Sequence, residues 1–127
     1  SPTVFYGDEA GMQGFEDPLN RGTYPWGQED SSLLAYFRQL GALRKQRISL
    51  QCGDIGYLYA VGGGLVLRRQ SEDEVTVAAM NAGMQPLELS IPWAGALAKD
   101  ALTGQHFFAR NGMLRLTLPP VGGVLLV

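Results

Sequence analysis

The sequence predicts a mostly β protein, in which an antiparallel sandwich of the Greek-key type follows one short strand, a long loop and one helix. From residue 48 onward, short runs of β-branched and aromatic residues alternate with turn residues at regular spacing, which is typical of antiparallel sandwiches. Before residue 48, an apolar run, an aperiodic stretch and a stripe of apolar residues at helical spacing follow one another. We therefore expect two parts, residues 1–47 and residues 48–127.

The first part opens on Thr3–Tyr6, a run of β-branched and aromatic residues with almost no polar alternation. Such a run is typical of a strand that is covered on both faces, as in a parallel sheet. The chain from Gly7 to Glu29 is rich in Gly, Asp, Pro and Asn. A loop of this length is uncommon in a compact domain unless it binds a ligand or folds over a site, so we expect a binding loop.

Several helix signals coincide over Ser31–Gln46. Asp30 or Ser31 can accept hydrogen bonds from the first free backbone N–H groups of a helix. Arg44 and Lys45 fall in the last turn, where positive charge is favourable at the negative end of the helix dipole. Apolar residues recur between them at spacings of three and four and form one stripe: Leu33, Tyr36, Phe37, Leu40 and Leu43.

The second part contains short strand-forming runs that turn residues separate. Strict alternation in Leu87–Ile91 and in residues 114–118 predicts strands with one buried and one exposed face. Asn111-Gly112 is the strongest hairpin signal, so the two runs that flank it should pair. The expected strands are Ile55–Val61, Leu65–Gln70, Val75–Ala82, Leu87–Ile91, Lys99–Leu102, His106–Ala109, Met113–Thr117 and Val124–Val127.

Length and composition exclude several classes of protein. A (β/α)8 barrel needs about 250 residues, whereas this chain has 127. The formal net charge of −2 offers no basic surface for nucleic acid. No apolar run approaches the roughly 20 residues of a membrane span. We therefore expect neither nucleic acid nor a membrane as a partner.

Single reactive residues give no sign of a metal or nucleophilic site. Cys52 is the only cysteine, so no internal disulfide can form, and we expect a reducing, cytoplasmic location. We interpret Cys52 as a small core residue, because no base lies near it in the sequence. His106 has no second His or Cys at ligand spacing, so we expect no metal and no cofactor. The acidic run Glu72–Glu74 should be a solvated hairpin tip.

The first part resembles the end of the catalytic barrel of glycoside hydrolases of the α-amylase family, family 13, in the neopullulanase, cyclomaltodextrinase and α-glycosidase branch. The similarity rests on Pro-Thr-Val-Phe-Tyr-Gly-Asp-Glu-Ala-Gly at residues 2–11, Asp-Pro-x-x-Arg at 17–21, Pro-Trp-Gly at 25–27 and Ala-Leu-Arg-Lys at 42–45. The second part has the length and strand rhythm of the C-terminal sandwich of that family. The resemblance implies a C-terminal fragment: the last strand, loop and helix of a (β/α)8 barrel, then the complete sandwich.

The resemblance further implies a parent enzyme that acts on α-1,4 or α-1,6 glucans or maltodextrins with retention. Retaining cleavage needs two carboxyl groups about 5–5.5 Å apart, and in this family they lie at the ends of earlier barrel strands. Asp8 and Glu9 are adjacent at the expected end of a strand, so their side chains should point to opposite faces; we interpret them as residues that fix the turn. We therefore expect no catalytic residue in this chain and no activity from the chain alone.

Asp17 and Arg21 are the candidate substrate-binding residues. The resemblance places this pair over the donor side of the cleft of the parent enzyme, where it would hydrogen-bond a glucose unit beyond the cleaved one. A carboxylate accepts hydrogen bonds from sugar hydroxyls, and a guanidinium donates them in a fixed fork. The alternative is a local ion pair that stiffens the loop. Tyr24 and Trp26 could stack on sugar rings or anchor the loop on the barrel.

Two other functions stay open for this sequence. The sandwich could be a non-catalytic module that binds starch or glycogen, which titration with maltoheptaose would detect, or a plain interaction domain with a specific protein partner. The expected strand Thr3–Tyr6 has no sheet neighbour within the chain, and an unpaired apolar edge tends to pair with another molecule. We therefore expect a dimer that forms through Thr3–Tyr6.

Overall fold

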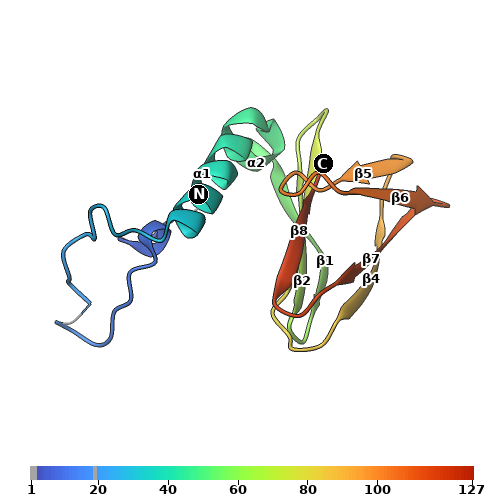
Figure 1. Cartoon of the computed structure of the whole chain (residues 1–127). Coiled ribbons are helices and arrows are strands. Elements are labelled where there is room, and N and C mark those ends of the chain that lie inside the picture. The colour runs from blue at the N-terminus through green and yellow to red at the C-terminus, as the bar shows by residue number, and fades with distance from the viewer. Residues whose placement is uncertain (1–2, 19) are drawn as a thin grey trace. The chain divides into compact units, whose positions relative to one another are not determined.

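The computed structural model describes residues 3–18 and 20–127. The chain divides into two compact units, residues 1–43 and residues 44–127. The first unit contains a short 3-10 helix, Asp8–Ala10, and most of helix α1, Ser31–Gln46. The second unit contains the end of α1, the short helix α2, Ile48–Cys52, and eight described strands (Figure 1).

Helix α1 begins and ends at the residues that the sequence predicts. Asp30 caps its N-terminus, because the Asp30 Oδ1 atom accepts hydrogen bonds from the backbone N–H groups of Ser32 and Leu33, both at 3.0 Å. The hydroxyl of Ser32 donates to the same oxygen at 2.6 Å. These hydrogen bonds, that from the Ser32 side chain first, lower the pKa of Asp30. No residue of α1 is buried, so its apolar stripe stays partly exposed in this chain.

The segment Thr3–Tyr6 is irregular and enters a turn at Tyr6, so the strand predicted there is wrong for this chain. A strand is stabilised by backbone hydrogen bonds to a neighbouring strand, and none of the strands among the described residues pairs with this segment. Phe5 and Tyr6 are 70% and 57% exposed. Apolar composition alone therefore does not produce a strand here.

The second unit is an antiparallel sandwich of two four-stranded sheets (Figure 1). The first sheet has the order β1 (Asp54–Val61), β2 (Gly64–Gln70), β3 (Val75–Asn81), β8 (Gly122–Leu126). The second has the order β4 (Leu87–Pro92), β7 (Met113–Leu118), β6 (His106–Arg110), β5 (Leu97–Lys99). Strand β4 lies beside β7 rather than beside the next strand in the chain, which is the Greek-key arrangement. The predicted antiparallel sandwich is therefore confirmed, whereas the strand predicted before it is not.

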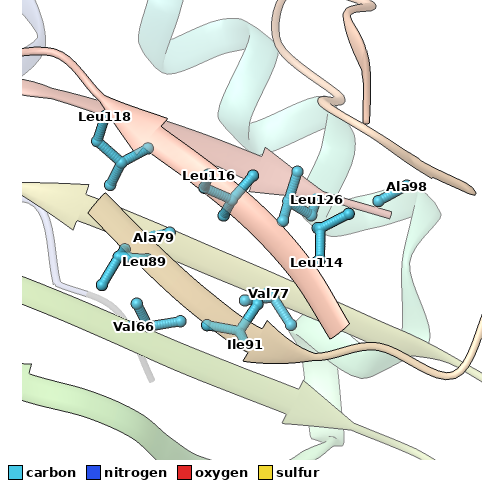
Figure 2. Close-up of a cluster of buried hydrophobic side chains, with 10 residues drawn as sticks. All are labelled: Val66, Val77, Ala79, Leu89, Ile91, Ala98, Leu114, Leu116, Leu118 and Leu126. Carbon is cyan, nitrogen blue, oxygen red and sulfur yellow. The ribbon is translucent and has the colours of Figure 1, made fainter. Parts of the chain in front are cut away.

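The hydrophobic core lies between the two sheets, and both contribute side chains that face one another (Figure 2). The strict alternation read from the sequence is confirmed in β4, where Leu89 and Ile91 are buried and the residues between and beside them are not. Strand β7 alternates in the same way. The buried residues of this cluster are Val66, Val77, Ala79, Leu89, Ile91, Ala98, Leu114, Leu116, Leu118 and Leu126.

The hairpin predicted at Asn111-Gly112 is confirmed. Both residues have positive φ, 52° and 73°, as a tight type I′ turn requires, and the flanking strands β6 and β7 pair there. The strand predicted over Lys99–Leu102 lies earlier, at Leu97–Lys99. The reason is Asp100, whose carboxylate accepts hydrogen bonds from the backbone N–H groups of the next residues and starts a turn.

Asp100 also joins the two sheets. Its backbone forms an isolated bridge with Leu126 of β8, and its Oδ1 atom accepts a hydrogen bond from the Leu125 backbone N–H at 3.0 Å. The residue is 1% exposed. Burial raises the pKa of Asp100, but the hydrogen bonds from Thr103, Leu125 and Leu102 outweigh it and lower the pKa overall. The charged carboxylate is therefore a stabilising part of the interior.

Helix α2 attaches to the first sheet through a buried polar cluster. The Ser49 hydroxyl is fully buried and donates to the Glu74 carboxylate, and the Ser49 backbone N–H donates to the same oxygen at 2.8 Å. Arg47 lies 3.4 Å from Glu74 and donates to the hydroxyl of Thr76 at 3.1 Å. The hydrogen bond from the Ser49 side chain is the main cause that lowers the pKa of Glu74.

The expectation of a solvated tip at Glu72–Glu74 is thus wrong for its last residue. Glu72 and Asp73 are exposed, whereas Glu74 is partly buried under α2. The sequence analysis did not predict α2, so it gave Glu74 no partner. A carboxylate that accepts two hydrogen bonds and faces a guanidinium is a structural group rather than a surface charge.

Candidate functional site

The candidate site lies in the first unit, on the loop from Gly7 to Asp30, which contains the short 3-10 helix and leads into α1. The loop begins at Gly7, whose φ of 85° favours glycine. The Asp8 carboxylate accepts a hydrogen bond from the Phe5 backbone N–H at 3.1 Å, so its predicted role in fixing the turn is confirmed. At the far end of the loop, the Asp30 N–H donates to the Ala10 carbonyl at 3.0 Å. These bonds hold both ends of the loop together.

Asp17 and Arg21 face one another across one turn of this loop. Arg21 Nε lies 2.6 Å from Asp17 Oδ1, and Arg21 Nη2 lies 3.1 Å from Asp17 Oδ2. This is the bidentate geometry of an arginine–carboxylate pair. The Arg21 backbone N–H donates to the Pro18 carbonyl at 3.1 Å, and the bond between Asp17 and Pro18 is cis. The two side chains that the sequence singled out are therefore brought together.

The ion pair leaves most of its hydrogen-bonding capacity open to solvent. The side chains of Asp17 and Arg21 are 59% and 75% exposed. A guanidinium has five N–H donors and a carboxylate about four acceptor positions, and the pair uses two of each. An exposed pair of this kind contributes only about 0–1 kcal/mol to stability. Stiffening of the loop is therefore a small effect, and the free donors and acceptors can still bind hydroxyl groups.

Three aromatic rings lie together in the same unit. The ring centroid of Tyr24 is 6.2 Å from that of Tyr6 and 4.6 Å from that of Trp26. Trp26 is 83% exposed, so its indole is accessible to a flat ligand in this chain. Burial is the main cause that raises the pKa of Tyr24, and the charges of Glu9 and Glu29 add to it. The Tyr24 hydroxyl therefore stays protonated at neutral pH.

The structure also shows the positions of Cys52 and His106, the two other reactive residues that the sequence singled out. Cys52 is exposed at the end of α2, with its thiol 3.6 Å from the Ile48 carbonyl, so its interpretation as a core residue is wrong. His106 is exposed on β6. Within residues 3–18 and 20–127, the His, Cys, Asp and Glu side chains form no group of three that could hold a metal ion.

Trp93 packs against the core of the sandwich, and its Nε1 donates a hydrogen bond to the Leu97 carbonyl at 3.1 Å. None of the helices that the structure describes is long and apolar enough to cross a membrane.

Two buried polar residues escaped the sequence analysis although a signal was present. Asn81 donates hydrogen bonds to the carbonyls of Gln85 and Pro119 at 2.8 and 2.9 Å and accepts one from Gly83 at 2.9 Å. Both Asn81 and Asp100 are followed within a few residues by glycine, which is the pattern of a side chain that bonds its own turn. Their role is to hold strand connections, not to bind a ligand.

Comparison of the sequence with known proteins identifies a family model and several relatives that this chain resembles. Residues 64–125 match the family model described as Maltogenic Amylase, C-terminal domain. A cyclomaltodextrinase from Geobacillus thermopakistaniensis is 35% identical over 98% of this chain and 22% of its own length. An amylopullulanase from Thermoanaerobacter thermohydrosulfuricus is 30% identical over 99% of this chain and 10% of its own length. The chain thus spans a small part of each relative.

Solved structures show the same fold. An α-amylase from Anoxybacillus superposes with a TM-score of 0.87 at 28% identity, over 95% of this chain and 27% of that one. The α-amylase from Geobacillus thermoleovorans, solved in complex with acarbose, gives a TM-score of 0.85 at 27% identity, over 95% of this chain and 28% of that one. Residues 64–125 therefore match the C-terminal domain of maltogenic amylases, and the chain as a whole is similar in sequence and fold to part of the glycoside hydrolases of the α-amylase family.

Proposed function

We propose that this chain is the C-terminal part of an enzyme that hydrolyses or transfers α-glucosyl units of α-glucans or maltodextrins. One observation carries the proposal: the chain matches an amylopullulanase and a cyclomaltodextrinase over 98–99% of its length but spans only 10–22% of theirs. The two catalytic carboxylates of a retaining mechanism would come from the rest of that enzyme. The chain alone would be inactive.

Within that enzyme, Asp17 and Arg21 would bind a glucose unit beyond the cleaved one. The support is geometric, because the pair is bidentate, exposed and mounted on a loop whose two ends are hydrogen-bonded together. Residues 1–47 would then complete the catalytic barrel with their loop and helix. The sandwich would pack on the catalytic barrel of that enzyme and stabilise it, and the partly exposed apolar stripe of α1 would be buried there.

The test compares variants of the whole enzyme that contains this chain. Asp17→Ala and Arg21→Ala should each remove hydrogen bonds between a charged group and a sugar hydroxyl, which corresponds to a loss of about 10- to 100-fold in kcat/KM for maltoheptaose. Most of the loss should appear in KM, because the pair touches a sugar beyond the reacting carbon. Glu16→Ala is the matched control, because Glu16 is an exposed carboxylate on the same loop and should change kcat/KM by less than about twofold.

The thermal stability of these variants separates the two roles of the pair. If Asp17 and Arg21 only stiffen the loop, their removal should lower the unfolding temperature slightly and should change kcat/KM no more than Glu16→Ala does. That result would contradict the proposed binding role. Release of reducing ends from pullulan or amylose by the purified chain alone, abolished by a substitution within it, would contradict the assignment of catalysis to the rest of the enzyme.

Two subsidiary proposals concern the environment of the chain. We propose a cytoplasmic location, because the lone Cys52 is an exposed thiol and exposed free thiols are typical of reducing compartments. We also propose that the isolated chain dimerises through residues 3–6, since Phe5 and Tyr6 expose apolar surface. Sedimentation equilibrium of the chain and of a Phe5→Ser variant measures this, and a monomer at all concentrations for both proteins would refute it.

A further inference from the structure

A hollow of about 520 Å³ lies on the outer face of the second sheet of the sandwich. Strands β4, β6 and β7 and the turn between β6 and β7 supply its lining. Ser90 pairs with Arg115 across β4 and β7, and Arg110 pairs with Met113 across β6 and β7. The residues that line the hollow are Ser90, Phe108, Arg110, Asn111, Met113 and Arg115.

Phe108 is the apolar side of this hollow. Its neighbour Phe107 packs against the core, whereas Phe108 points to the opposite face of β6 and is 75% exposed. Its ring is in contact with no other aromatic ring among the described residues. A phenylalanine on a sheet face contributes nothing to the core, so its ring is free to stack on a flat apolar surface.

The rest of the lining is rich in hydrogen-bond donors. The side chains of Arg110 and Arg115 are exposed, and neither guanidinium forms an ion pair or hydrogen bond with any of the residues that the structure describes. Ser90 and Asn111 add a hydroxyl and an amide that can both donate and accept. No carboxylate lines the hollow. Two guanidinium forks beside one aromatic face suit a ligand with vicinal oxygen atoms and one apolar face.

We propose that this hollow is a binding site for a short stretch of α-glucan, distinct from the site proposed at Asp17 and Arg21. A glucose ring has an apolar face that can lie on Phe108 and hydroxyl groups that Arg110 and Arg115 can bond from its edge. The proposal rests on the proposed function, which brings the chain to α-glucans. One stacked ring and a few exposed hydrogen bonds correspond to a dissociation constant of about 1 mM.

The test titrates the full chain with maltoheptaose and follows backbone amide shifts by NMR. Shift changes should concentrate at Ser90 and at residues 108–115. Phe108→Ala should weaken binding about tenfold or more, and Arg115→Gln about three- to tenfold. Tyr57→Ala is the matched control, because Tyr57 is a 71% exposed aromatic residue on β1 of the other sheet, and it should leave the affinity within about twofold.

Three results would overturn the inference. They are an absence of shifts up to about 20 mM maltoheptaose, equal binding by wild type and Phe108→Ala, and shifts of the lining residues with inorganic phosphate but not with maltoheptaose, which would make the hollow an anion site. A titration at high salt also distinguishes the two ligands, because salt weakens the binding of an anion at Arg115 but hardly affects the binding of a neutral sugar. Hydrolysis by the whole enzyme is measured separately, so hydrolysis without binding refutes only this site, and binding without hydrolysis refutes only the proposed function.

Discussion

Replacement of Asp100 by asparagine should destabilise the sandwich although it keeps the shape of the side chain. The Asp100 carboxylate accepts hydrogen bonds from the backbone N–H groups of Leu125, Leu102 and Thr103 at 3.0, 3.2 and 3.3 Å. The Thr103 hydroxyl donates to it as well. An amide has only one acceptor oxygen, so at least one of these N–H groups loses its partner in the Asp100→Asn variant.

The expected size of this effect follows from the hydrogen bonds. Bonds to a charged acceptor contribute roughly 1.5–3 kcal/mol each and neutral ones about 1 kcal/mol, while an unsatisfied buried N–H costs about 1–3 kcal/mol. Weaker bonds to Leu125 and Leu102, together with one unpaired N–H at Thr103, lower the free energy of unfolding by about 3 kcal/mol. Asp73→Asn, at an exposed position in the β2–β3 turn, should stay within about 0.5 kcal/mol of wild type.

Urea unfolding of the full chain, followed by far-ultraviolet circular dichroism, measures the effect, and equal slopes in wild type and variant would show that the comparison is valid. The pH dependence gives a second measurement. The folded-state pKa of Asp100 is lowered, so its stabilisation is complete above the unfolded value of about 3.9 and is lost as the pH falls through the folded value. The difference between wild type and Asp100→Asn should therefore shrink below about pH 4. A variant as stable as Asp73→Asn at neutral pH would refute the reasoning.

The remaining stability predictions concern the α2 cluster and the core. Ser49→Ala should lower the free energy of unfolding by about 1–3 kcal/mol. It should also raise the pKa of Glu74 towards its ordinary value, because the hydrogen bond from the Ser49 hydroxyl is the main cause of the lowered pKa. An NMR titration of the Glu74 carboxyl group checks the second result, and an unchanged pKa would contradict it. Leu114→Ala removes a fully buried side chain and should lower the free energy of unfolding by about 2–5 kcal/mol. Met113→Ala, on the outer face of the same strand, should lower it much less. Equal losses of stability in urea unfolding would show that the assigned core face is wrong.

The sandwich could be predicted from the sequence because buried apolar and exposed polar residues alternate along its strands. In β4 and β7 the buried and exposed residues follow a period of two, and that period is a property of strand geometry that needs no knowledge of neighbours. The Asn111-Gly112 turn is equally local, since positive φ at two successive positions favours these residues. Strand bounds therefore moved by only one or two residues in most cases.

The errors arose where structure depends on distant partners. Thr3–Tyr6 has the composition of a strand but lacks a neighbour to bond with. Glu74 lies in an acidic turn, and only the contact with Ser49, 25 residues earlier, makes it a structural group. The Asp17–Arg21 pair was found because its Asp-Pro-x-x-Arg motif is part of the resemblance to the α-amylase family, and the two residues are only four apart. The hollow at Phe108 was missed because three strands that are not consecutive in the chain line it.

Strand β8 can join its sheet only late, because it is far in sequence from the strand with which it pairs. It is the last strand of the described chain and pairs with β3, so residues 122–126 complete a sheet whose other strands end at Asn81. During synthesis from the N-terminus, β3 must wait with an open edge until about 40 further residues have emerged, and contacts so distant in sequence form slowly. The nascent polypeptide is therefore most prone to aggregation in the interval between the emergence of β3 and that of β8.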